Sequence, residues 1–334
     1  MAGSRSLRKL QIGKESGGAA GTPVAATTIW RGMGVIKDQR EIIFPEEDVG
    51  ILGGTTRSYE ARHWSELSMD SVESTFEQLP YIFEAGVAVE TPTQDGSGSG
   101  YIYAYVSPTT AQNTIKTYTW EGGDDQQAEE FDYAFVQSFN LSGEAQGALM
   151  LSAEWFGRET TNTTFTGALS IPDVEEILVN SGKLYIDDSG GTIGDTEVSS
   201  TLFGIDLSWD TGLQAYWAVD GSKDFSLHKF TSDEIVLNVT YEHNASAVTE
   251  KAKYRDQSVR LIRLLFEGSD FTTAGTTYSA HTMIIDLAGV YEDWSALEDT
   301  DGNDTVTASL RCRYSGTDTL KAEVIIVNEL ATLP

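Results

Sequence analysis

Residues that could carry out chemistry are few and dispersed in this chain. Its four histidines, His63, His228, His243 and His281, form no His-x-x-x-His or Glu-x-x-His pair, and its single cysteine is Cys312. Metal sites need such ligands at short, regular spacings, so we expect none of these histidines to bind a metal. One cysteine excludes an intramolecular disulfide. Its place on an alternating strand predicts a buried core residue rather than a reactive thiol.

Other motifs lead to the same expectation. There is no Gly-x-Ser-x-Gly elbow of a serine hydrolase, and Ser97–Gly100 lacks the lysine and helix that a phosphate-binding loop needs. The run Asp299–Asp304 concentrates oxygen ligands, but its glycine stands fourth and no glutamate stands twelfth, so it is not an EF-hand loop. We interpret it as a solvated turn between strands.

Acidic pairs are the remaining candidates for acid–base chemistry. Glu46-Glu47, Asp124-Asp125 and Glu175-Glu176 lie in polar segments without the aromatic cleft of a sugar hydrolase, so we interpret them as surface charge. Glu-Gly recurs at Glu121-Gly122 and Glu267-Gly268, which we interpret as a shared strand-ending turn. The sequence therefore predicts neither an enzyme nor a cofactor.

Charge is the strongest compositional signal. The chain of 334 residues carries a formal net charge of −29, from 51 acidic and 22 basic residues. Such a surface repels phosphates, so we expect any DNA to pass the protein without specific binding. The acidity is equally compatible with solubility alone or with a high-salt host. No apolar run is long enough for a signal peptide or a membrane span, so we expect no membrane insertion.

Length and pattern predict a mainly β protein of the α+β class with two tandem antiparallel β-sandwich or barrel-like domains, each with one flanking helix. We expect an extended N-terminal arm over residues 1–28, a first domain over 29–160 and a second over 161–334. The basis is a repeated order of elements: strand-like, helix-like and strand-like runs follow one another in both halves. A duplicated unit is typical of pseudo-symmetric assemblies such as rings and tubes.

Local patterns place the elements. Helices are expected over Glu73–Gly86 and Ser246–Arg255, with Ser246 as an N-cap. Alternation over Val306–Tyr314 predicts a half-buried antiparallel strand with Cys312 and Tyr314 on its apolar face. The segment from Pro45 to Asp70 predicts a long exposed hairpin or loop, and such long loops are generally functional.

Several short stretches resemble the tail tube (major tail) proteins of viruses with long, non-contractile tails. They are Leu10–Glu15, Thr28–Gly32, Phe139–Glu144 and Val327–Leu330. The resemblance implies a β-sandwich with a flanking helix, rings stacked around a DNA channel, and a stacking loop at Asp38–Ser71 that reaches the next ring. A tandem form implies a pseudo-hexameric ring made of three chains.

This resemblance also implies partners and a location. The chain is expected to associate with itself, with tail terminator and tail tip proteins, and with a tape measure protein that fills the lumen before DNA. It is expected in the virion tail, after assembly in the host cytoplasm. Contacts between subunits are expected at the basic arm and the long loop: Arg5, Arg8, Lys9, Lys14, Pro45, Glu46, Glu47, Asp48, Arg57 and Arg62.

Alternatives from other classes stay open at this point. One is a secreted carbohydrate-binding β protein, suggested by Trp209, Trp217 and Trp294. Another is a glycoside hydrolase that depends on Asp124 or Asp125. A third is the inner tube of a contractile injection machine. The ring stoichiometry, the tail length, the host and the loops that line the lumen are not determined by the sequence.

Overall fold

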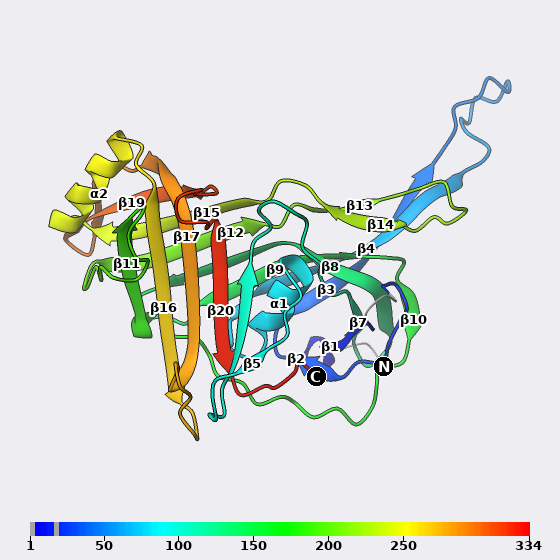
Figure 1. Cartoon of the computed structure of the whole chain (residues 1–334). Helices are drawn as coiled ribbons and strands as arrows, with labels where there is room; N and C mark the ends of the chain where they lie inside the picture. The colour runs from blue at the N-terminus through cyan, green and yellow to red at the C-terminus, as the bar shows by residue number, and fades with distance from the viewer. Residues whose placement is uncertain (1–3, 17–19) are drawn as a thin grey trace.

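A computed structural model of the chain describes residues 4–16 and 20–334 and consists mainly of antiparallel β-strands (Figure 1). The expected mainly β class is confirmed. The first-half elements are β1 (Lys9–Lys14), β2 (Thr28–Trp30), β3 (Gly34–Ile43), β4 (Tyr59–Glu73), α1 (Leu79–Gly86), β5 (Thr93–Gln94), β6 (Tyr101–Val106), β7 (Tyr118–Gly123), β8 (Ala128–Glu144), β9 (Met150–Gly157) and β10 (Thr161–Thr163). Those of the second half are β11 (Gly182–Asp188), β12 (Leu202–Asp210), β13 (Leu213–Tyr216), β14 (Leu227–Phe230), β15 (Glu234–Glu242), α2 (Ala245–Arg255), β16 (Arg260–Asp270), β17 (Ala280–Trp294), β18 (Glu298–Thr300), β19 (Asn303–Cys312) and β20 (Ala322–Asn328).

In the first half the strands pair in the order β3–β4–β9–β8. Strand β8 belongs to two layers. Its C-terminal part pairs with β9, and its N-terminal part pairs with β7 and β10. On the far side of β7 lies β1. A register shift between Val136 and Ser138 lies where β8 passes from one layer to the other, and such bulges bend a strand.

The second half repeats this order of pairing. Its strands pair as β12–β15–β19–β17, while the N-terminal part of β17 pairs with β16 and β20, and β11 lies beside β16. Its register shift falls between Tyr291 and Asp293. The helix also follows the second strand of the row in both halves.

Two pairings join the halves. Strand β8 pairs with β12 from Ser138/Asp210 to Glu144/Gly204, and β6 pairs with β20. One hydrophobic core runs through both halves, from Leu10 to Leu333. Because the sheet and the core are both continuous, the division at residues 160/161 stays a prediction.

Each helix is fixed to its half by one buried glutamate, the sixth residue of the helix in both cases. Glu84 of α1 accepts from Lys14 Nζ at 2.6 Å and from the Tyr118 hydroxyl. Glu250 of α2 accepts from both Arg260 Nε (2.9 Å) and Arg260 Nη2 (2.8 Å). Tyr118 and Arg260 occupy matching places, since Tyr118 lies opposite Ala134 of β8 and Arg260 opposite Gly289 of β17.

The structure corrects several expected boundaries. Residues 9–14 are not part of an extended arm, because β1 lies between β2 and β7 with Leu10 and Ile12 buried. Helix α1 begins at Leu79, since residues up to Glu73 extend the β4 ladder. Asn244, not Ser246, caps α2 by accepting from the amides of residues 246 and 247.

Two further expectations differ in part. Strand β19 has the expected alternation and buries Cys312, whose pKa burial raises to about 12, but Tyr314 lies beyond the strand and is exposed. Glu121-Gly122 is not a strand-ending turn: Glu121 is buried within β7, where its carboxylate accepts from the amides of Ala26 and Thr166.

Removal of the α2 anchor tests its contribution. Glu250→Ala leaves the buried Arg260 guanidinium with only the largely exposed Asp188 as an acidic partner, so we expect the free energy of unfolding to fall by about 2–4 kcal/mol in urea titration. Thr249→Ala, on the exposed side of the same helix, should change it by less than about 0.5 kcal/mol. Equal small effects of the two substitutions would contradict the anchoring role.

A buried carboxyl in β8 predicts a pH dependence. Burial raises the pKa of Asp132 from 3.8 to about 6. Because the protonated carboxyl is favoured in the folded state, it stabilises the fold fully at pH values below the pKa of the unfolded state. This stabilisation is lost as the pH rises through about 6. Asp132→Asn should therefore raise the free energy of unfolding by about 1–3 kcal/mol at pH 8 and by much less near pH 4. An equal gain at both pH values would be inconsistent with this pKa.

Candidate functional site

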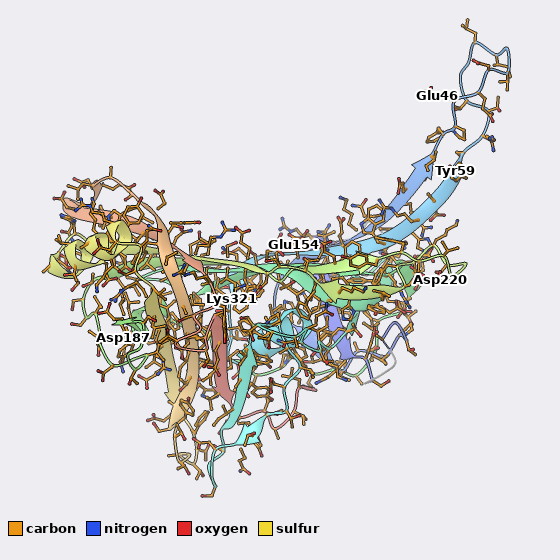
Figure 2. The ribbon with its side chains drawn as sticks, turned by 45° about the horizontal axis from the view of Figure 1, so that its top comes forward. Glu46, Tyr59, Glu154, Asp187, Asp220 and Lys321 are labelled. Carbon is orange, nitrogen blue, oxygen red and sulfur yellow. The ribbon has the colours of Figure 1, made fainter. Side chains whose placement is uncertain are left out.

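The most exposed feature of the molecule is the β3–β4 hairpin, whose far end projects away from the rest of the chain (Figures 1 and 2). We call residues 44–58, which connect the two strands, the hairpin tip. Large apolar side chains of the tip lie in solvent: Phe44 (62% exposed), Val49 (49%), Ile51 (57%) and Leu52 (106%). Exposed apolar groups clustered at one end of a molecule are typical of a surface that another molecule covers.

Charges surround these apolar groups at the tip. Glu46, Glu47 and Asp48 are consecutive, and Arg57 from the returning strand lies 2.7 Å from Glu47. Because the Arg57 side chain is 64% exposed, this ion pair orders the tip only weakly. The tip therefore presents a mixed apolar and acidic surface.

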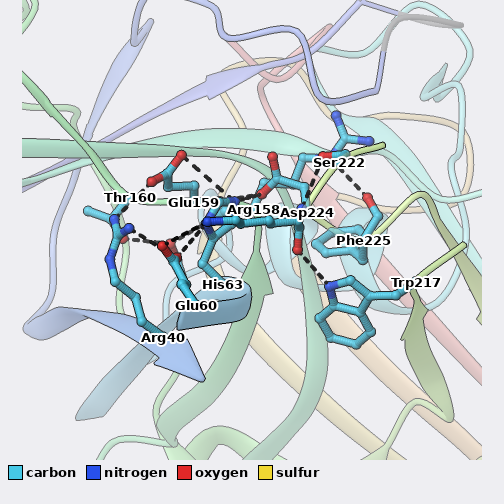
Figure 3. A network of polar contacts seen from close by, with 12 residues as sticks. Arg40, Glu60, His63, Arg158, Glu159, Thr160, Trp217, Ser222, Asp224 and Phe225 are labelled. Carbon is cyan, nitrogen blue, oxygen red and sulfur yellow. Dashed lines mark hydrogen bonds and ion pairs between the residues drawn. The ribbon is translucent and has the colours of Figure 1, made fainter. Parts of the chain in front are cut away.

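The hairpin is held to the body at His63, near the start of β4 (Figure 3). His63 Nδ1 lies 2.9 Å from Glu60, and its Nε2 lies 3.2 Å from Asp224 and 3.8 Å from Glu159. Glu159 follows β9, and Asp224 belongs to the connection between β12 and β15. One imidazole thus joins the hairpin to both halves of the chain.

Arg40 of β3 completes this network. Its guanidinium bonds Asp38 (3.0 Å), Glu60 (3.2 Å) and Glu159 (2.8 Å). The bonds to Asp38 and Glu159 raise the pKa of Arg40, and the hydrogen bond from His63 lowers the pKa of Glu60. Arg40 therefore supplies positive charge between the carboxylates around the hairpin base.

An aromatic cluster lies beside the hairpin base. Phe225 is fully buried, with ring centroids 4.8 Å from Tyr133, 5.7 Å from Phe156 and 5.9 Å from Phe135. Its neighbour Trp217 donates from Nε1 to the Lys223 carbonyl at 3.0 Å. Residues 211–233, which contain β13 and β14, thereby fold from the second half onto the sheet of the first.

Residues 211–233 and the hairpin tip are equivalent connections. Each joins the first two strands of its row, β12 to β15 or β3 to β4. The second-half connection is packed on the neighbouring unit through Phe225. The first-half connection has no such cover from any residue that the structure describes.

Basic residues near the N-terminus contact their own chain. Arg5, Arg8 and Lys9 border a cleft of about 360 Å³ against β3 and the end of β7. Lys9 Nζ lies 4.0 Å from the centroid of the Phe165 ring, and Lys14 pairs with Glu84. Lys14 thus pairs with a residue of its own chain and anchors α1.

The expected contact residues fall into separate groups. Pro45, Glu46, Glu47, Asp48 and Arg57 come together at the hairpin tip. Arg62 lies at the hairpin base, 2.5 Å from Glu41, with its guanidinium 4.7 Å from the Trp217 ring. Arg5, Arg8, Lys9 and Lys14 lie on another part of the chain.

Sequence reasoning missed the residues that hold the hairpin. His63 and Arg40 were not singled out, because no motif marks a histidine whose partners come from distant segments. Phe225 was also missed, although the polar connection that contains it has two phenylalanines, Phe225 and Phe230. Such a pattern can indicate a loop that packs on a distant surface.

A metal-binding cluster is not found in the described part of the chain. No group of three or more histidine, cysteine or acidic residues there is placed to hold a metal ion. Residues 299–304 form a turn between β18 and β19, in which Asp299 accepts from the Gly302 amide at 2.8 Å. None of the helices in the described ranges is long and apolar enough to cross a membrane.

Phe225 provides a test of how the hairpin base is held. Phe225→Ala opens a cavity among three aromatic rings, so we expect the free energy of unfolding to fall by about 3–5 kcal/mol. Limited proteolysis should then cut within residues 211–233 faster than in the unaltered chain. Val219→Ala, at a fully exposed position of the same segment, should change neither readout. Unaltered cleavage of the Phe225 variant would contradict the anchoring role.

Comparisons with known proteins add no family assignment. No protein-family model matches the chain, and no curated protein matches it. Inferences about its function therefore depend on the arrangement described above.

Proposed function

We propose that this chain is a structural subunit that associates with copies of itself into stacked rings, forming the tail tube of a virus with a long, non-contractile tail. Three chains would make one pseudo-hexameric ring. Viral DNA would pass through the channel without specific binding, and the chain would carry no enzymatic activity or cofactor.

The projecting hairpin is the observation that carries this proposal. Its tip exposes Phe44, Ile51 and Leu52 at a distance from the core, where they gain nothing from the fold of their own chain. Transfer of one such side chain from water into a contact contributes about 1.5–3 kcal/mol. The base is fixed by the His63 and Arg40 network, so the tip is held in one direction, as a contact between subunits requires.

The repeated order of pairing supports the ring. Two copies of one unit in a chain, joined edge to edge through β8 and β12, provide two pseudo-equivalent parts of a closed wall. The net charge of −29 suits a channel that DNA must cross without binding. Tail terminator, tail tip and tape measure proteins would be the partners of such a tube.

The carbohydrate-binding alternative gains no support from Trp209, and Trp217 and Trp294 are partly buried in aromatic clusters. Trp209 is 1% exposed and packs against Phe139 at 5.3 Å, and Trp217 packs in the cluster around Phe225. Sugar-binding sites use aromatic rings that solvent can reach. Self-association is the function that the geometry supports better.

Electron microscopy of the purified full chain tests the proposal directly. We expect rings or tubes, and we expect the double substitution Ile51→Ser and Leu52→Ser to raise the concentration needed for tube formation at least ~10-fold, because apolar contacts of the tip are lost. The thermal transition should be unchanged, since the tip is outside the core.

Val219→Ser is the matched control, because Val219 is as exposed as Leu52 but lies elsewhere. It should leave assembly unchanged. A chain that remains monomeric at every concentration would refute the proposed function.

A further inference from the structure

The junction between β8 and β12 shows in atomic detail how one unit of this chain joins another. Thr211 N donates to the Gln137 carbonyl, and Ala145 N donates to the Phe203 carbonyl. Both bonds fit the antiparallel register in which Trp209 lies opposite Phe139. The side chains at this junction are covered: Leu207 and Leu141 are both fully buried.

Equivalent residues of the two units can be identified from the strand pairing alone, without relying on sequence similarity. One row across the first half runs Ile36, Leu67, Trp155, Val136. The matching row across the second half runs Leu207, Leu237, Leu310, Tyr291. The same register shift follows Val136 and Tyr291, so β3 is the equivalent of β12, and the end of β17 is the equivalent of β8.

No strand within residues 4–16 or 20–334 pairs with the outer edge of either equivalent of the junction strands. Asp70 N donates to the Met33 carbonyl, so by alternation the amides of Gly34, Ile36, Asp38 and Arg40 point away from β4. These four residues are the equivalents of β12 residues whose backbone groups bond to β8. Ser295 N donates to the Thr307 carbonyl, so Trp294, the equivalent of Phe139, has its backbone groups directed away from β19.

Side chains along these two edges are exposed and complementary. Ile36 is only partly buried, although its equivalent Leu207 is fully buried. Val35 (55% exposed) and Leu297 (56%) are apolar groups on opposite edges. The β3 edge carries Lys37, whose side chain is 66% exposed, and the exposed end of β17 carries Glu292 and Asp293. Opposite charges on facing strands favour pairing.

We propose that the β3 edge of one copy pairs with the Asp293–Leu297 edge of a second copy, in the register of the internal β8–β12 junction. Asp38 then lies opposite Trp294, and Lys37 lies opposite Ser295. This inference rests on the proposed function, and it specifies the surfaces through which two copies of the chain bind each other. It gives each copy eight strands of one continuous wall: β3, β4, β9, β8, β12, β15, β19 and β17.

The contact is head to tail, because two different edges meet. Such a contact closes into a ring when the rotation between copies allows it. It also removes two open sheet edges, which otherwise present unpaired backbone groups to any strand in solution.

Disulfide trapping measures the register. Lys37 and Ser295 correspond to Ser208 and Asn140, which form a non-hydrogen-bonded pair with closely spaced side chains. Chains with Lys37→Cys and chains with Ser295→Cys are mixed in the assembled state and oxidised with diamide. We expect at least ~10-fold more covalent dimer than from Lys183→Cys mixed with Ser295→Cys, because a disulfide needs Cα atoms within about 7 Å.

Lys183 is the matched control, since it is an exposed lysine on another strand. The unaltered chain, whose Cys312 is buried, controls for background. The same samples are imaged by electron microscopy. Rings with a selective Lys37–Ser295 link support the proposal. Rings without that link overturn this register while the proposed function stands, and a complete absence of assemblies overturns both.

Asp38→Pro is an independent variant. It removes an amide that points away from β4, so the fold should keep its thermal transition, while ring formation is lost. Asp38→Ala loses the same bond to Arg40 but keeps the amide, and it should assemble because Glu60 and Glu159 still hold Arg40. Normal rings from the proline variant would overturn the proposal.

Discussion

Backbone hydrogen bonding between β8 and β12 is the constraint on which the rest of the structure depends. It joins the last strand of one row to the first strand of the next, so eight strands form one continuous surface. It also fixes where residues 211–233 lie, because this connection leaves β12 at Thr211 and packs Phe225 against the first half. The hairpin base is then held through Asp224 and His63. A single edge-to-edge contact thereby sets the direction of the projecting tip.

The two halves share positions rather than chemistry. In both, a glutamate at the sixth position of the helix is buried against the strand beneath it, but Lys14 and Tyr118 bond Glu84, whereas an arginine and Tyr291 from a different strand bond Glu250. The same holds for the rows of core residues, in which Trp155 has Leu310 as its equivalent. Geometry of pairing is therefore the property that repeats, since different sets of side chains can fill a core when their total volume is suitable.

Local patterns in the sequence were sufficient to predict much of the fold. Alternation identified β19, and the polar segment after Ile43 predicted the exposed hairpin tip, because both signals depend on neighbouring residues. The exposed segment expected to continue to Asp70 was too long, because residues 59–70 belong to β4, where Leu67 and Met69 are buried. The arm expectation was wrong for β1, because Gly13 and the nearby glycines obscure a strand whose partner β7 lies more than a hundred residues away. The His63 network and the Phe225 cluster were not predictable for the same reason: their partners come from segments that lie far away in the sequence. The register shifts that establish the equivalence of the halves carry no local signature.

Amide hydrogen exchange tests the central claim most directly, because it reads the backbone of each edge. The full chain is compared at a concentration below assembly and at one above it. The account predicts that the amides of Gly34, Ile36, Asp38 and Arg40 become protected on assembly, while those of Val35, Lys37 and Gln39, already paired with β4, change little. Unchanged exchange at the even-numbered positions in the assembled state would contradict it.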